Sequence, residues 1–335
     1  MKEEGGRRMD AAIIMSPAGT ALICGAAFVI VAAGMYAAAD FLNPILFALL
    51  IAVLMAPFRK KLLEMGVPPV AAAALVMGAV VLSSVFLVWV LSTSLIQMGE
   101  ALPAYQEMLG TQVERIRSFM PETGVPAGEI IINGDTPFRP SVVSVLTGLA
   151  TLLAEFFLVL LVTVFFLPAV GERHALGRYS DVVVGYFTGR GRTALATGTG
   201  TGLFLLVTGV DFPLLWGVLV FILCFIPFIG IWIAAVPPIG MAWLEYGTPG
   251  AAAVAIAIAG SNYLGERISV TPDTGKVPDL SPAVTIVSLF FWTRVLGIPG
   301  MFLAVPLTLA AKTLLESSEE TRWLARLMET KRSEQ

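Results

Sequence analysis

The sequence is poor in the residues on which soluble enzymes and metalloproteins depend. Its 335 residues include one histidine and two cysteines, and 13% are charged, about half the share of a soluble globular domain. His174 has no second histidine or cysteine nearby, so no metal-ligand spacing exists. Cys24 and Cys224 lie within apolar runs and are expected to be small buried side chains rather than a disulfide. The composition excludes a cytosolic enzyme and a nucleic-acid-binding protein, and it indicates no cofactor.

The sequence is rich in long hydrophobic runs. Hydrophobic residues make up 57% of the chain, and the mean hydropathy is +0.85. Several apolar runs approach or exceed the roughly 20 helical residues that cross a bilayer. The sequence therefore predicts an all-α polytopic membrane protein that contacts the lipid bilayer. Six crossings plus two helical hairpins broken by proline and glycine fit these runs, and so do eight to ten crossings.

The apolar runs and the charges between them divide the chain into five parts. These are the N-terminal membrane helices 1–3 (1–96), an extracytoplasmic segment (97–140), helices 4–5 (141–210), a transport core (211–315) and a cytoplasmic tail (316–335). Within the first part a break is expected at 40–44, and the second part is expected to start as an amphipathic helix that continues to about Phe119. The fourth and fifth helices are expected to flank a cytoplasmic loop at 169–192. Lysine and arginine in short loops favour the cytoplasm. Placing both termini there brings all four basic clusters inside and leaves the acidic segment outside.

The transport core contains an internal repeat. Residues 212–246 and 282–315 are both apolar and both interrupted by proline and glycine, and an offset of 69 residues aligns seven identities. The aligned residues are Pro213 with Pro282, Val218 with Val287, Phe221 with Phe290, Ile229 with Ile298, and 235–237 with 304–306. Because one apolar helix, 249–264, lies between the copies, we expect two inverted broken hairpins. Such breaks mark the substrate site of secondary transporters, which predicts that the tips meet and that Pro227, Gly230, Pro299 and Gly300 line the route.

Charged residues at membrane depth are costly and are functional candidates by default. Glu155 stands at the centre of the 141–168 run, where a protonated carboxyl bonded to a neighbouring helix is the structural alternative. Arg294 lies within the second repeat and is expected to pair with Glu155 or Glu266. Asp211 and Glu245, by contrast, are expected to be solvated helix ends.

A second polar group follows at the inner end of the helix between the repeats. Asn262 and Glu266 are four residues apart and share a helix face, and Arg267 is a counter-ion or a membrane anchor. An ordinary polar helix end is the alternative here. Upstream, Gly198 and Gly202 have the spacing of close helix packing and lack the lysine of a phosphate-binding loop.

These residues resemble a known family. The stretch 225–230 after 209–213, the Asn262 and Glu266 helix, and 297–300 followed by 303–307 look like the AI-2E family transporters. The resemblance implies transport across the inner (cytoplasmic) cell membrane of a small polar solute such as autoinducer-2, or of a monovalent cation in exchange for a proton. Antiport would need a titratable carboxylate such as Glu155 or Glu266, whereas export would need the hydrogen-bonding groups of Ser261, Asn262 and Tyr263.

Two further expectations concern assembly. Glycine-rich helices and the extramembrane segment 97–140 favour a homo-oligomer. The alternative to transport is a membrane scaffold or assembly partner that docks through this segment, and it predicts a dry, closed interior. An intramembrane enzyme is the weakest hypothesis, because no nucleophile and base stand at a recognisable spacing.

Overall fold

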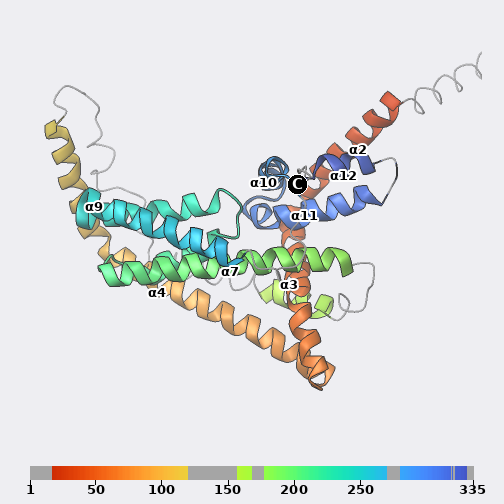
Figure 1. The fold of residues 1–335 in the computed structure, drawn as a ribbon, viewed down its shortest axis with the longest axis horizontal. Helices are drawn as coiled ribbons and strands as arrows, with labels where there is room; N and C mark the ends of the chain where they lie inside the picture. The colour runs from red at the N-terminus through yellow and green to blue at the C-terminus, as the bar shows by residue number, and fades with distance from the viewer. Residues whose placement is uncertain are drawn as a thin grey trace, which may run out of the picture.

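The computed structural model describes residues 17–119, 157–167, 177–269, 280–317, 319 and 321–329, and within these ranges the chain is helical and holds no strand. The helices are α2 (Pro17–Ala37), α3 (Ala39–Glu64), α4 (Pro69–Phe119), an unlabelled helix (Phe157–Leu167), α7 (Gly177–Thr208), α8 (Pro213–Leu223), α9 (Gly230–Ser269), α10 (Pro282–Leu296), α11 (Ile298–Glu316) and α12 (Arg322–Leu327) (Figure 1). The expected all-α class is confirmed.

Several of these helices have the length and composition of membrane spans. Three are long and apolar enough by themselves, namely Ala39–Glu64, Pro69–Ala101 and Ile298–Glu316, and four shorter apolar helices accompany them in the described ranges. Large apolar side chains on α2, α3 and α4 are exposed, as expected for surfaces that face lipid. The chain is a multi-pass helical membrane protein, while the number of crossings and the orientation of the termini stay predictions.

The first two helices join at a different residue from the one predicted. The break lies at Ala38, and Asp40, Asn43 and Pro44 are all inside α3. A proline lacks the N–H that would bond to the carbonyl four residues earlier, and its ring crowds that carbonyl. The irregularity therefore falls more than one turn before Pro44 instead of at the proline.

Helix α4 is a single unbroken element of 51 residues. At 1.5 Å per residue it is about 77 Å long, more than twice the roughly 30 Å hydrocarbon core of a bilayer. Its apolar part ends at Ala101, and the remainder continues as a helix to Phe119, as the spacing predicted. Figure 1 shows α4 running along much of the length of the molecule toward one end of α9.

Most of the predicted loop 169–192 is helical. Helix α7 begins at Gly177, so residues 177–192 are helical. Val183, Phe187 and Ala194 recur at helical spacing and are 1%, 9% and 0% exposed. The charged residues between them obscured this amphipathic pattern, because they lie on the other faces of the same helix.

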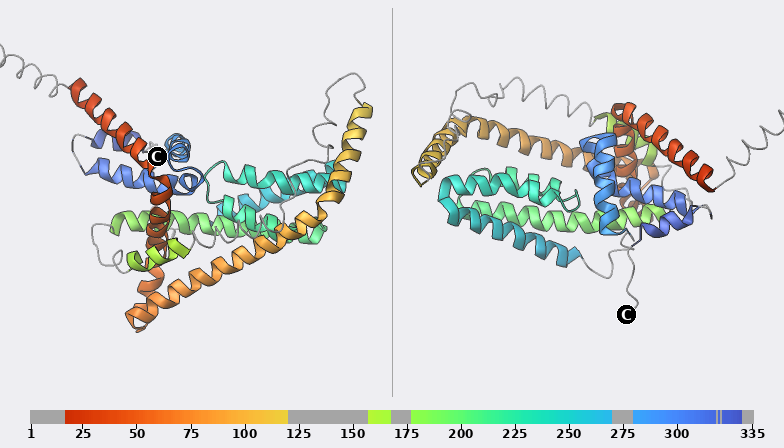
Figure 2. Two further views of the ribbon diagram at one scale, coloured as in Figure 1. Left: turned by 180° about the vertical axis from the view of Figure 1, so that it is seen from behind. Right: turned by 90° about the horizontal axis from the view of Figure 1, so that it is seen from above.

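Helix α7 holds α8 and α9 through close backbone contacts, and the three run side by side (Figure 2). A Cβ on Gly198 would lie 2.7 Å from the carbonyl oxygen of Gly217 in α8, and one on Gly265 would lie 2.9 Å from that of Thr193. Gly202 also packs on α8, with 3.3 Å to the oxygen of Pro213. The predicted small-residue packing of Gly198 and Gly202 is confirmed.

Two turns in the transport core share one conformation. Gly247 has φ 70° and ψ −160°, and Gly297 has φ 74° and ψ −154°. Each begins a Gly-x-Pro-Gly sequence, 247–250 and 297–300. A Cβ on Gly250 or Gly300 would lie 2.8 Å or 2.0 Å from the carbonyl oxygen eight residues earlier. The first glycine is needed for the dihedral angles and the last for close approach.

This similarity revises the proposed register of the repeat. The 69-residue offset does align helix starts, since α8 and α10 both begin at the paired prolines Pro213 and Pro282. The turn after α10, however, has its conformational counterpart at 247–250 inside α9, 50 residues earlier, and not at 224–229. The aligned side chains pair residues 69 apart, whereas the turn conformations pair residues 50 apart. The two pairings differ because identities between apolar residues partly reflect the apolar composition, whereas a positive φ angle marks a place where the chain changes direction.

Substituting the first glycine of each turn tests this geometry. We expect Gly247→Ala and Gly297→Ala each to lower the free energy of unfolding by about 1–3 kcal/mol, because a Cβ is strained at these angles. Gly240→Ala is the control, since it lies in α9 with nothing within 4 Å of a Cβ. Thermal unfolding in detergent, followed by tryptophan fluorescence, measures the difference. Equal melting temperatures for all three variants would contradict the shared turn conformation.

Candidate functional site

The first broken hairpin has an irregular tip. Helix α8 ends at Leu223 and α9 begins at Gly230, and Phe228 between them has φ 60°. Such a left-handed conformation is a genuine outlier for a bulky residue and is found at functional sites. A Cβ on Gly230 would lie 1.7 Å from the carbonyl oxygen of Leu223. Glycine therefore lets the chain reverse tightly over the end of α8.

The tip of the first hairpin packs against the second hairpin. Ile226 is buried in one cluster with Leu289 of α10 and Ala304 of α11, and Ile229 packs beside them. Ile298, the sequence partner of Ile229, is 71% exposed. The first tip therefore contacts the bodies of α10 and α11 and not the turn at 297–300, and the prediction that the two tips meet is wrong. Of the four residues predicted to line the route, Pro227 lines the cavity beside this tip, whereas Gly230, Pro299 and Gly300 do not.

A cavity of about 220 Å³ opens at this junction. The lining residues come from α7, the first tip, the start of α10 and α11, and are Tyr186, Arg190, Pro227, Phe228, Leu280, Pro282, Thr285 and Val305. Arg190, Tyr186 and Thr285 supply a fixed cation and two hydroxyl groups. The remaining lining residues are apolar. The cavity therefore combines a mostly apolar lining with a few polar groups, as small-molecule binding sites do.

One polar group of this cavity has hydrogen-bonding capacity left over. The hydroxyl of Tyr186 is buried beside the guanidinium of Arg190, which interacts with its oxygen, and the hydroxyl proton has no acceptor in the described chain. A buried donor without an acceptor costs about 1–3 kcal/mol. A bound solute or water that bonds to Tyr186 would remove that cost.

The second break is covered by a residue from the N-terminal part of the chain. Asn43 of α3 donates a hydrogen bond of 3.2 Å from Nδ2 to the carbonyl oxygen of Leu296, which the end of α10 leaves without a helical partner. Its own Oδ1 is buried without a hydrogen bond in the part of the chain that is described. In the sequence, Asn43 stands out only as an amide side chain within an apolar run. The fold is needed to show that this amide bonds to the carbonyl group of Leu296.

The predicted polar group lies on the part of α9 that packs against α7, a helix that also lines the cavity. Ser261, Gly265 and Ser269 face α7, and Ser269 Oγ lies 2.6 Å from Thr193 Oγ1. Glu266 is on an exposed face, although both it and Arg190 are close enough to act electrostatically on the Cys224 thiol. Asn262 is half-buried between these faces.

The two predicted arginines contact aromatic rings. Arg267 donates to the Tyr263 hydroxyl with 3.0 Å from Nε and lies over that ring. The guanidinium of Arg294 lies 5.0 Å from the centre of the Tyr36 ring of α2, a cation–π contact. The expected pairing of Arg294 with Glu266 is wrong, since no ion pair joins them. Glu155 lies outside the described residues.

A further polar centre lies at the other end of α7, α8 and α9. The Tyr105 hydroxyl of α4 contacts a carboxylate oxygen of Asp211 and lies 2.8 Å from Oε1 of Glu245. Burial, followed by these hydrogen bonds, raises the pKa of Tyr105 far above its usual value. A single hydroxyl proton serves one acceptor, so both contacts are hydrogen bonds only when one carboxyl group carries a proton. Both residues contact Tyr105 of α4. Asp211 is nevertheless exposed, as predicted, whereas Glu245 is half-buried and is not the solvated helix end that was expected.

Known proteins that resemble this chain over most of its length are transport proteins. The sequence profile described as AI-2E family transporter matches residues 26–172 and 169–320. A Haemophilus influenzae protein named "Putative transport protein" is 30% identical over 90% of this chain and 94% of its own length. The Escherichia coli protein named "AI-2 transport protein TqsA" is 28% identical over 90% of this chain and 92% of its own.

The Tyr105 bridge can be tested by removing one oxygen. We expect Tyr105→Phe to lower the free energy of unfolding by about 1–3 kcal/mol, because Asp211 and Glu245 lose the hydroxyl group that both contact. The loss should grow as the pH falls and one carboxyl group takes up a proton, since both contacts are then hydrogen bonds. Tyr246→Phe is the control, because its hydroxyl makes an exposed bond of 3.1 Å to Gly209 at the same end of the molecule. Thermal unfolding in detergent at several pH values measures both, and equal losses would count against the bridge.

Proposed function

The chain belongs to the AI-2E transporter family, and on that premise we propose that it carries a small polar solute past the junction of its two broken hairpins. Its relatives are transport proteins, so the coarse function is membrane transport and not catalysis. The observation that carries the finer proposal is the cavity beside Pro227 and Phe228. Broken helices place free backbone groups at membrane depth, which is how secondary transporters build substrate sites.

The chemistry of the cavity favours a solute with acceptor oxygens. Arg190 donates only, and the hydroxyl proton of Tyr186 has no acceptor in the described chain. A volume of about 220 Å³ is that of about seven water molecules. An oxygen-rich molecule of the size of autoinducer-2, the cargo in the name of the Escherichia coli relative, suits these groups.

Sodium/proton antiport is less well supported by the same site. The residues that line the cavity include a fixed cation and no carboxylate, and a cation beside Arg190 would be repelled. Glu266 lies on an exposed face of α9. We therefore assign Glu266 and Asn262 to the approach to the cavity, while Pro227, Gly230, Pro299 and Gly300 shape its two breaks.

A scaffold without transport finds less support in the structure. It requires a dry, closed interior, whereas the cavity holds an arginine and a buried hydroxyl whose proton has no acceptor in the described chain. Self-association and the placement of both termini in the cytoplasm of the cell remain compatible with either role. Flux is therefore the measurement that separates transport from scaffolding.

The proposal is tested by flux in proteoliposomes. We expect Arg190→Gln to lower autoinducer-2 flux by at least about tenfold, since a charged hydrogen bond contributes about 1.5–3 kcal/mol. Tyr186→Phe should lower it less. Arg322→Gln is the matched control, because this exposed arginine of α12 does not line the cavity. Full flux in Arg190→Gln would overturn the assignment of the cavity.

The same vesicles decide between solute and ion. Sodium/proton exchange should be absent from the wild type, and Glu155→Gln and Glu266→Gln should retain autoinducer-2 flux within a few-fold. Exchange that disappears in either glutamine variant would instead assign carboxylate-coupled antiport. No flux of either kind in the folded wild type would favour the scaffold.

A further inference from the structure

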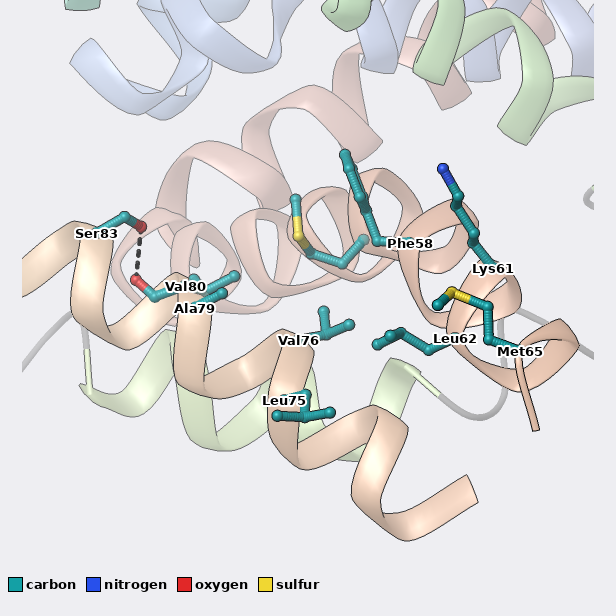
Figure 3. A pocket seen from close by; sticks show the side chains of 10 residues that line it. Phe58, Lys61, Leu62, Met65, Leu75, Val76, Ala79, Val80 and Ser83 are labelled. Atoms are coloured by element: carbon teal, nitrogen blue, oxygen red, sulfur yellow. Dashed lines mark hydrogen bonds between the residues drawn. The ribbon is translucent and has the colours of Figure 1, made fainter. Parts of the chain in front are cut away.

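A second cavity lies far along the chain from the transport core. It is an apolar groove of about 460 Å³ between the end of α3 and the start of α4. Its lining consists of Met55, Phe58, Lys61, Leu62, Met65, Leu75, Val76, Ala79, Val80 and Ser83 (Figure 3). The turn that contains Gly66 joins the two helices, which then diverge as a V (Figure 2). Residues of both helices line the groove.

The walls of this groove offer almost no hydrogen-bonding group. The hydroxyl of Ser83 already donates to the carbonyl oxygen of Val80, at 2.9 Å (Figure 3). Val76 is buried at the floor, and Leu160 of the helix Phe157–Leu167 packs in the same cluster. At the rim, Phe58, Met65 and Leu75 are exposed. An occupant must therefore be apolar along most of its length and able to enter from the side.

One end of the groove carries a positive charge. Lys61 is the only charged residue in the lining, and it makes no ion pair in the described chain. It stands near the end of the apolar helix Ala39–Glu64, where a lysine reaches the head-group level. Its neighbour Lys60 differs, because it pairs with Glu64 at 3.9 Å and does not line the groove.

From this arrangement we propose that the α3–α4 groove binds one anionic phospholipid. An acyl chain lies against the apolar walls, and the phosphate head group contacts Lys61. Basic pockets between membrane helices recognise anionic head groups in this way, and the volume lies within the usual range of ligand sites. The loop charges predict that this end faces the cytoplasm, where anionic lipids attract juxtamembrane lysines. The site is separate from the transport cavity, so it stands whether or not the proposed substrate is correct.

Native mass spectrometry of the full-length protein in detergent tests the head-group contact. The probes are phosphatidylglycerol and phosphatidylcholine with identical acyl chains, offered in equal amounts. The wild type should prefer phosphatidylglycerol by about fivefold, the ratio expected from one lysine near a membrane surface. Lys61→Gln should bring the preference close to one. Lys60→Gln, which removes the same charge one residue away, should retain it.

A second pair of variants tests the apolar walls. Leu75→Trp should reduce binding of both lipids several-fold by filling the rim, and Leu82→Trp, at an exposed position two turns further along α4, should not. Both residues are exposed, so neither change disturbs a buried core. Glycerol 3-phosphate, which has the head-group charge without acyl chains, should not bind.

Three results would overturn the proposal. One is equal binding of the two lipids by the wild type, and another is a preference that survives in Lys61→Gln. The third is a change of oligomeric state in Leu75→Trp without a change in lipid binding, which would assign the groove to a second copy of this chain.

Discussion

The rest of the structure depends on one constraint, which is that backbone polar groups at membrane depth must be satisfied within the protein. A helix meets this constraint by itself, but a break in a helix does not. The tip at 224–229 and the turn at Gly297 release carbonyl and amide groups. Such breaks survive only where protein covers them or where they border an aqueous cavity. Both conditions are met here, because Asn43 covers Leu296 and a cavity borders Pro227.

The packing of the core follows from the same constraint. The three helices α7, α8 and α9 approach closely because Gly198, Gly217 and Gly265 lack side chains at their crossings. This proximity lets α7 present Tyr186 and Arg190 to the break between α8 and α9. Serine and threonine hydroxyls in the contact bond to carbonyls or to each other, as Thr193 and Ser269 do. The close contacts among these helices thus lie along their regular parts, and the described breaks lie at their ends or at Gly247.

Charge has a different role at each end of the molecule. At one end, Tyr105 contacts two carboxyl groups and holds α4 against Asp211, between α7 and α8, and against Glu245, just before the Gly247 turn within α9. At the other, arginine and lysine stand beside cavities, with Arg190 at the hairpin junction and Lys61 at the α3–α4 groove. Because these two cations line separate cavities, a solute site and a lipid site can coexist without sharing a residue.

The sequence by itself determined the helical membrane class, the broken core and the proline and glycine positions that break it. These are local properties: hydrophobic length sets a span, and the backbone limits of proline and glycine set where a helix starts or ends. It could not show that Arg294 lies over Tyr36, that Arg190 reaches the first tip, or that the turn at Gly297 matches the one at Gly247. Only the tertiary structure decided these, because each depends on how distant helices cross, and apolar side chains of similar hydropathy do not specify a partner.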